Sequence, residues 1–80
     1  MGSINIYRTG KSKKSQKFIE FSATDYEKFE RDQMSEKGRW RRTKESIILD
    51  RSKGGMEICR MEENDKKFID GDGVVYAKVE

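Results

Sequence analysis

Apolar residues are scarce in this chain, and their number limits it to one small hydrophobic core. Hydrophobic residues make up 32% of the 80 positions, whereas charged residues make up 41%. Two cores would leave halves of about 40 residues, a size that usually folds only with disulfides, metals or oligomerisation. We therefore expect a single domain over residues 1–80, in which residues 1–3 are a frayed end or a cloning scar.

Two short segments near the N-terminus have the composition of β-strands. Residues 4–7 combine alternating isoleucines with a tyrosine, and residues 17–21 hold aromatic and β-branched side chains. Residues 9–16 between them are rich in Ser and Lys and contain Gly10. This pattern predicts a hairpin whose strands are joined by a mobile basic loop.

A capping box predicts one helix over Asp25–Lys37. Thr24 is followed three residues later by Glu27, the spacing at which two side chains cap the first turn of a helix reciprocally. Tyr26 and Phe29 are also three residues apart, which places them on the same side of a helix. We therefore expect this helix to bury both aromatic rings against a sheet.

The second half of the chain predicts three further strands. Residues 39–51, 56–61 and 74–79 carry β-branched and apolar side chains, and Ser52–Gly55 and Asp70–Gly73 are typical turn sequences. The expected order is ββαβββ. The predicted fold is α+β, a curved antiparallel sheet of about five strands with one helix packed across it and at least one open edge.

Missing residue types argue against an enzyme. The chain has no His and a single cysteine, Cys59, so it lacks the commonest general base, the commonest metal ligand and any intrachain disulfide. We expect no catalytic residues, no metal and no cofactor, and we expect Cys59 to be buried in its strand. A lone thiol favours a reducing, cytoplasmic location. No apolar run approaches the roughly 18 residues of a membrane helix, so no membrane partner is expected.

Basic residues concentrate in segments 11–17 and 37–44, and the second segment includes the only tryptophan. Arginine matches phosphate geometry, and an exposed tryptophan gives bases a surface on which to stack. The leading hypothesis is a non-enzymatic protein that binds nucleic-acid backbone with little sequence preference. The predicted contact residues are Lys11, Lys13, Lys14, Lys17, Arg39, Trp40, Arg41, Arg42 and Lys44.

Trp40 separates this hypothesis from an alternative one. A chain with so few apolar residues also needs Trp40 for its core. The alternative is a small protein-binding regulator or inhibitor, of the kind found in phages and mobile elements, which docks through charge-patterned surfaces or an edge strand. An exposed Trp40 surrounded by arginines favours nucleic acid, whereas a buried Trp40 with an apolar patch elsewhere favours a protein partner. The choice between DNA and RNA and the oligomeric state stay open.

Overall fold

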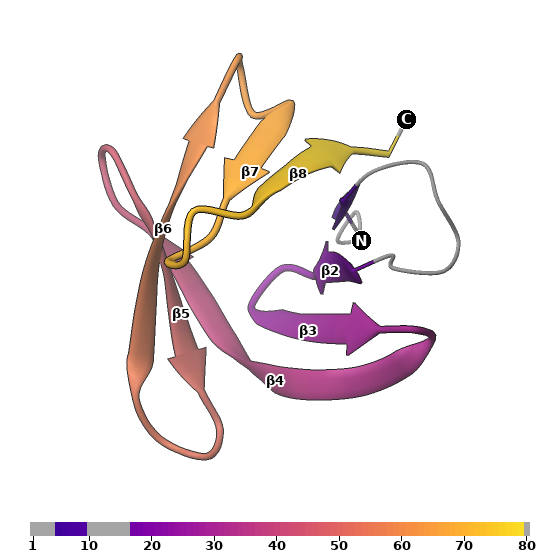
Figure 1. Ribbon diagram of the computed structural model, residues 1–80. Coiled ribbons are helices and arrows are strands. Elements are labelled where there is room, and N and C mark those ends of the chain that lie inside the picture. The colour runs from indigo at the N-terminus through magenta and orange to yellow at the C-terminus, as the bar shows by residue number, and fades with distance from the viewer. Residues whose placement is uncertain (1–4, 10–16, 80) are drawn as a thin grey trace.

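The computed structural model describes residues 5–9 and 17–79, which form eight β-strands (Figure 1). Each strand pairs antiparallel with the next along the chain, and β8 pairs with β1, so the sheet closes into a barrel. The described residues contain no helix. The strands are β1 (Asn5–Arg8), β2 (Lys17–Phe21), β3 (Asp25–Glu30), β4 (Gln33–Arg42), β5 (Ile47–Arg51), β6 (Met56–Glu62), β7 (Lys67–Ile69) and β8 (Val75–Lys78).

The prediction of an α+β fold is wrong, because the segment expected to form a helix over Asp25–Lys37 forms a β-hairpin. Strands β3 and β4 pair along this segment and are joined by Arg31 and Asp32. Both residues have positive φ angles, 53° and 64°, as the two central residues of a type I′ hairpin turn require. The protein is therefore an all-β barrel of eight strands, not a sheet of about five strands covered by a helix.

The false helical pattern arises because β3 presents one aromatic ring on each face. Tyr26 is buried inside the barrel, whereas Phe29 lies on the outer face and stacks on Phe18 of β2 with ring centroids 4.6 Å apart. The residue that shares the inner face with Tyr26 is Lys28. Lys28 faces inward where the strand period of two would place an apolar residue, and the aromatic Phe29 faces outward. The two aromatic residues of β3 are therefore three positions apart, which is also a helical spacing.

Closure of the barrel also corrects the expected open edge of the sheet. Tyr7 and Arg8 of β1 pair with Lys78 and Ala77 of β8, and the Val79 N–H donates to the carbonyl of Ile6 at 2.8 Å. The first and last strands therefore protect each other's backbone groups instead of leaving them free for a partner strand.

Strand β4 is drawn in Figure 1 as a long curved ribbon, and it pairs with both β3 and β5. A Cβ atom on Gly38 of β4 would overlap the backbone carbonyl of Asp50 and would lie 3.0 Å from the Tyr26 ring. Glycine is required here because the neighbouring backbone approaches too closely for any side chain.

An aromatic cluster fills much of the barrel. Phe68 is fully buried, and its ring centroid lies 5.5 Å from that of Phe21 and 5.4 Å from that of Tyr76. Both contacts are edge-to-face, the geometry that aromatic quadrupoles favour. The buried core comprises Tyr7, Ile19, Phe21, Tyr26, Ile47, Leu49, Cys59, Phe68 and Tyr76.

Candidate functional site

The outward arginines of β4 differ in what lies opposite them. Arg39 lies in register with Asp25 on β3 and with Asp50 on β5, so acids flank it on both sides. Arg41 lies opposite Ile48 on β5. Neighbouring opposite charges weaken the positive potential that would attract a phosphate backbone. The outer face of β4 is therefore less basic than the sequence of residues 37–44 indicates.

Trp40 and Arg42 point toward the barrel interior. The Trp40 ring is partly buried, its centroid lies 5.2 Å from that of Phe21, and its indole N–H donates to the carbonyl of Ser22 at 2.8 Å. The Arg42 guanidinium donates two hydrogen bonds, 2.7 and 2.8 Å long, to the carboxylate of Asp65. Trp40 is thus tied into the core, and only part of it stays accessible.

The structure separates the described residues of the two basic segments. Lys17 begins β2, at the end of the barrel where β1 ends, and Lys44 is exposed in the turn between β4 and β5. Successive strands run antiparallel, so these two lysines lie at opposite ends of the barrel. The other predicted contacts of the first segment, Lys11, Lys13 and Lys14, lie outside the described residues.

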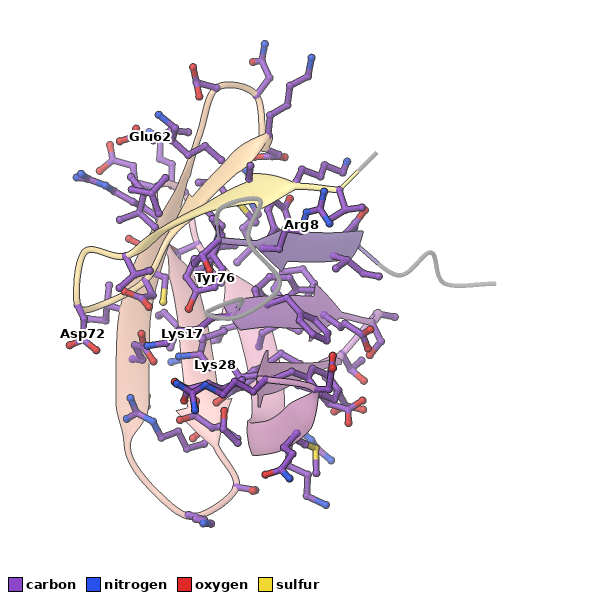
Figure 2. All side chains as sticks on the ribbon, turned by 45° about the vertical axis from the view of Figure 1, so that its right-hand side comes forward. Arg8, Lys17, Lys28, Glu62, Asp72 and Tyr76 are labelled. Carbon is purple, nitrogen blue, oxygen red and sulfur yellow. The ribbon has the colours of Figure 1, made fainter. Side chains whose placement is uncertain are left out.

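The barrel interior holds a charged cluster that sequence reasoning missed. Lys28 Nζ donates to the Glu57 carboxylate at 2.7 Å, and Arg51 Nη2 donates to the same carboxylate at 3.1 Å. Arg51 Nε donates to Glu36 at 3.1 Å, and the Gly71 N–H donates to Glu57 at 2.8 Å. Figure 2 shows Lys28 toward the middle of the molecule. We call Lys28, Glu36, Arg51 and Glu57 the ion cluster.

The charged form of Glu57 is favoured although its side chain is buried. Burial tends to raise the pKa of Glu57, but the hydrogen bonds from Lys28 and Gly71 and the charges of Lys28 and Arg51 hold that pKa below its ordinary value. Within the described residues, every buried side-chain nitrogen or oxygen has a hydrogen-bond partner. The side chains of the cluster are therefore held in place by one another.

One signal in the sequence could have revealed the ion cluster. Cys59 is buried as expected, and burial raises the pKa of its thiol to about 12. Glu57 is two residues earlier on β6 and must share its face. A buried Cys59 therefore implies a buried Glu57, which in turn requires cationic partners from other strands.

The outer face of strands β5 to β8 carries an apolar patch. On β6, Ile58 is 67% exposed and Met56 is 60% exposed. Ile58 lies opposite Ile48 of β5, and Val75 of β8 lies opposite Ile69 of β7. We call these five residues the outer apolar patch. Large exposed apolar side chains are notable in a chain that has so few with which to build its core.

A groove of about 420 Å³ borders the outer apolar patch. Ile58 and Arg60 line it from β6, Ile69 lines it from β7, and Gly71 lines it from the loop before β8. The β6–β7 ladder spans only Arg60–Glu62 on β6, so Ile58 lies outside the part of β6 that pairs with β7. The groove therefore follows the place where these two strands separate.

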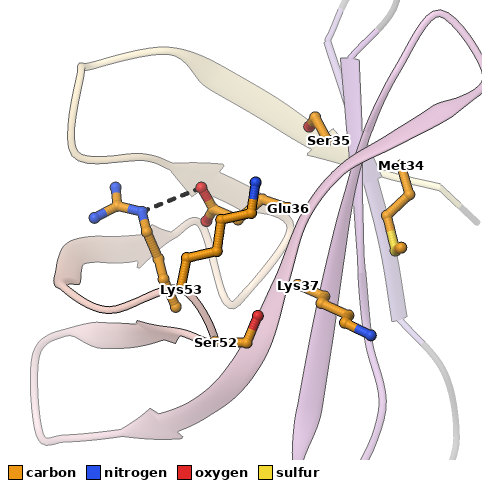
Figure 3. Close-up of a pocket in the computed structure, with 7 residues that line it drawn as sticks. Met34, Ser35, Glu36, Lys37, Ser52 and Lys53 are labelled. Carbon is orange, nitrogen blue, oxygen red and sulfur yellow. Dashed lines mark hydrogen bonds and ion pairs between the residues drawn. The ribbon is translucent and has the colours of Figure 1, made fainter.

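A second cleft, of about 330 Å³, lies between the β3–β4 and β5–β6 hairpins (Figure 3). Met34 and Lys37 line it from β4, and Ser52 and Lys53 line it from the turn after β5. The dashed line in Figure 3 is the Arg51–Glu36 ion pair. Because Arg51 is engaged in this ion pair, the cations of the cleft that are available to a ligand are the two exposed lysines, Lys37 and Lys53.

Other chemical sites do not emerge from residues 5–9 and 17–79. No three His, Cys, Asp or Glu side chains of this region are grouped as metal ligands would be. The same region has no helix long and apolar enough to cross a membrane. Comparison with known proteins adds no assignment: no family model, no curated protein and no solved structure matches this chain.

Proposed function

We propose that the protein is a small binding domain that docks on a protein partner through the outer apolar patch. The observation that carries this proposal lies on β6, where the charged residue Glu57 is only 8% exposed and its apolar neighbour Ile58 is 67% exposed. Exposed apolar groups gain free energy when a partner covers them. The half-buried Trp40 supports the same class of partner, because its ring packs against the core.

The surroundings of the outer apolar patch define the chemistry of the partner. Arg41 lies opposite Ile48, and Arg60 lies opposite Ile69. Arg60 also pairs with Glu62 at 3.3 Å, whereas Arg41 makes no ion pair among the described residues. A complementary surface presents an apolar side chain to the groove beside Ile58 and a carboxylate to Arg41.

The test uses the full chain to capture its partner, followed by affinity measurements on the purified pair. Ile58→Arg places a charge at the centre of the outer apolar patch and should raise the Kd by at least about tenfold, as loss of a central contact typically does. Met34→Arg is the matched control, because Met34 is 48% exposed on β4, outside the patch. Circular dichroism should show that both variants are folded.

Equal affinity of the Ile58→Arg variant and the wild-type protein for the captured partner would contradict the proposal. So would a Met34→Arg variant that loses as much affinity as Ile58→Arg. In the first case the partner contacts another face, and in the second the effect is a general one of added charge.

Nucleic-acid binding stays a prediction with one supporting feature, the exposed Arg41 and Lys44. If these residues bind phosphates, the affinity for a labelled single-stranded oligonucleotide should fall with salt by roughly 0.7 log units per contact for each tenfold rise. Arg41→Ala should lower that slope. An absence of binding at micromolar protein and low salt would remove this hypothesis.

A further inference from the structure

One end of the barrel contains a cavity of about 100 Å³ that is lined by both apolar and polar side chains. Phe21, Trp40 and Met61 line it from β2, β4 and β6. Three charged side chains also line it, namely Arg42, Asp65 and Lys78. We call this cavity the barrel mouth. It is separate from the outer apolar patch, because its lining side chains point inward.

The Trp40 ring is held in one orientation at the barrel mouth. Its N–H is bonded to the Ser22 carbonyl, and its edge-to-face contact with Phe21 fixes the plane of the ring. Phe21 is 2% exposed, whereas Trp40 stays partly accessible. A fixed and partly accessible aromatic ring is suited to contact with a planar group.

The barrel mouth has one positive charge that is not neutralised by an ion pair. Arg42 and Asp65 neutralise each other through two hydrogen bonds. Lys78 lies on the inner face of β8 and makes no ion pair among the described residues. Hydrogen bonding from Arg42 lowers the pKa of Asp65, and the charge of Lys78 lowers it further. The barrel mouth therefore favours an anion near Lys78.

A strained turn adjoins the barrel mouth. Glu63, Asn64 and Asp65 all have positive φ angles, 53°, 57° and 68°. None of the three is glycine, so the run is unfavourable for the backbone. It is held by the Tyr7 hydroxyl, which donates to the Asp65 carbonyl at 2.7 Å, and by the ion pair with Arg42. Strain of this kind is concentrated at ligand-binding sites in proteins.

We propose that the barrel mouth binds a small aromatic carboxylate, with its ring against Trp40 and its carboxylate beside Lys78. A dry cavity of roughly 150 Å³ can hold a benzene molecule. The barrel mouth is smaller and open, so it takes up part of a single ring and leaves the carboxylate at the charged side chains. This site is independent of the proposed docking of a protein partner.

Fluorescence of the full chain tests the proposal, because Trp40 is its only tryptophan. Titration with benzoate should change the emission in a saturable way, and neutral benzamide should bind at least about tenfold more weakly because it lacks the charge that Lys78 recognises. Lys78→Gln should reduce benzoate affinity by about the same factor. Lys66→Gln is the matched control, because Lys66 is exposed in the adjoining turn and does not line the cavity.

A second variant keeps the test decisive if Lys78→Gln does not fold. Met61→Phe enlarges a side chain that lines the barrel mouth and should abolish the benzoate response. The proposal is wrong if benzoate causes no saturable change at tens of millimolar, or if benzamide binds equally well. It is also wrong if inorganic phosphate displaces benzoate at equal concentration, because the ring would then contribute nothing.

Discussion

The barrel encloses two regions that are stabilised in different ways. One is the aromatic cluster around Phe68, whose ring centroid lies 5.4 to 5.9 Å from those of three neighbouring rings. The other is the ion cluster, in which Lys28 and Arg51 share the carboxylate of Glu57. Glu57 is buried as the rings are, whereas Arg51 keeps 33% of its side chain exposed.

Burial alone therefore does not determine how a region contributes to stability. Each buried apolar side chain adds roughly 1.5–3 kcal/mol. A buried ion pair has a desolvation cost close to its Coulomb gain, so the intact pair adds little. Its members depend on one another, because removal of one partner leaves an uncompensated charge inside the protein.

Phe68→Ala should lower the free energy of unfolding by about 3–5 kcal/mol, the usual range for a fully buried phenylalanine. Phe68 is fully buried and contacts three other rings. Against a typical total of roughly 5–15 kcal/mol, such a loss is severe. Urea denaturation measures it, and the loss should be the same at pH 7 and at pH 3. A loss that depends strongly on pH would show that the two regions are coupled.

Glu57→Gln should cost about 3 kcal/mol at pH 7, because Lys28 loses its closest anionic partner. The pKa of Glu57 is lowered in the folded protein from its ordinary value of 4.5. Its ionised form therefore stabilises the fold above that value, and this contribution is lost as pH falls through the folded-state pKa. The difference between variant and wild type should shrink from pH 7 to pH 3. A constant difference would mean that Glu57 acts through packing and not through charge.

Addition of Lys28→Met to Glu57→Gln should restore about 1 kcal/mol of the stability lost by Glu57→Gln alone. The double variant removes the lysine that Glu57→Gln leaves with only its 3.8 Å contact to Glu36. The Arg51–Glu36 pair stays intact, and the introduced amide oxygen can still accept the Gly71 N–H. A double-mutant cycle at pH 7 measures the coupling. Two losses that simply add would show that Lys28 and Glu57 do not interact, and the ion cluster would then resemble the aromatic one.

The sequence predicted several strands and turns but not the eight-stranded barrel. Residues 17–21, 56–61 and 74–79 overlap β2, β6 and β8, and the predicted Ser52–Gly55 turn joins β5 to β6. The segment from 25 to 37 has a misleading pattern, because the β3–β4 turn is Arg31–Asp32 and lacks the usual Asn-Gly signal. Barrel closure depends on the register between β1 and β8, which local patterns do not encode.

The candidate sites could be predicted only in part from the sequence, because the role of each side chain depends on which face of its strand it occupies. A run of basic residues does not show that Arg39 is flanked by acids or that Arg42 is bound to Asp65. Lys78 was not predicted at all, since it is a single lysine in an apolar strand. Its inward position depends on strand phase, and a one-residue shift in phase reverses it.

The strand ladders of this barrel fall into two groups, according to how far apart along the chain their two strands lie. Seven of its ladders join consecutive strands, and each can form once a short connection has brought its ends together. Only the ladder of Tyr7 and Arg8 with Lys78 and Ala77 joins strands far apart along the chain. Forming that one ladder costs a large amount of chain entropy. This cost is offset only when the remaining strands are already ordered. The hairpins of consecutive strands thus form first, and the β1–β8 pairing that closes the barrel last makes the folding transition cooperative.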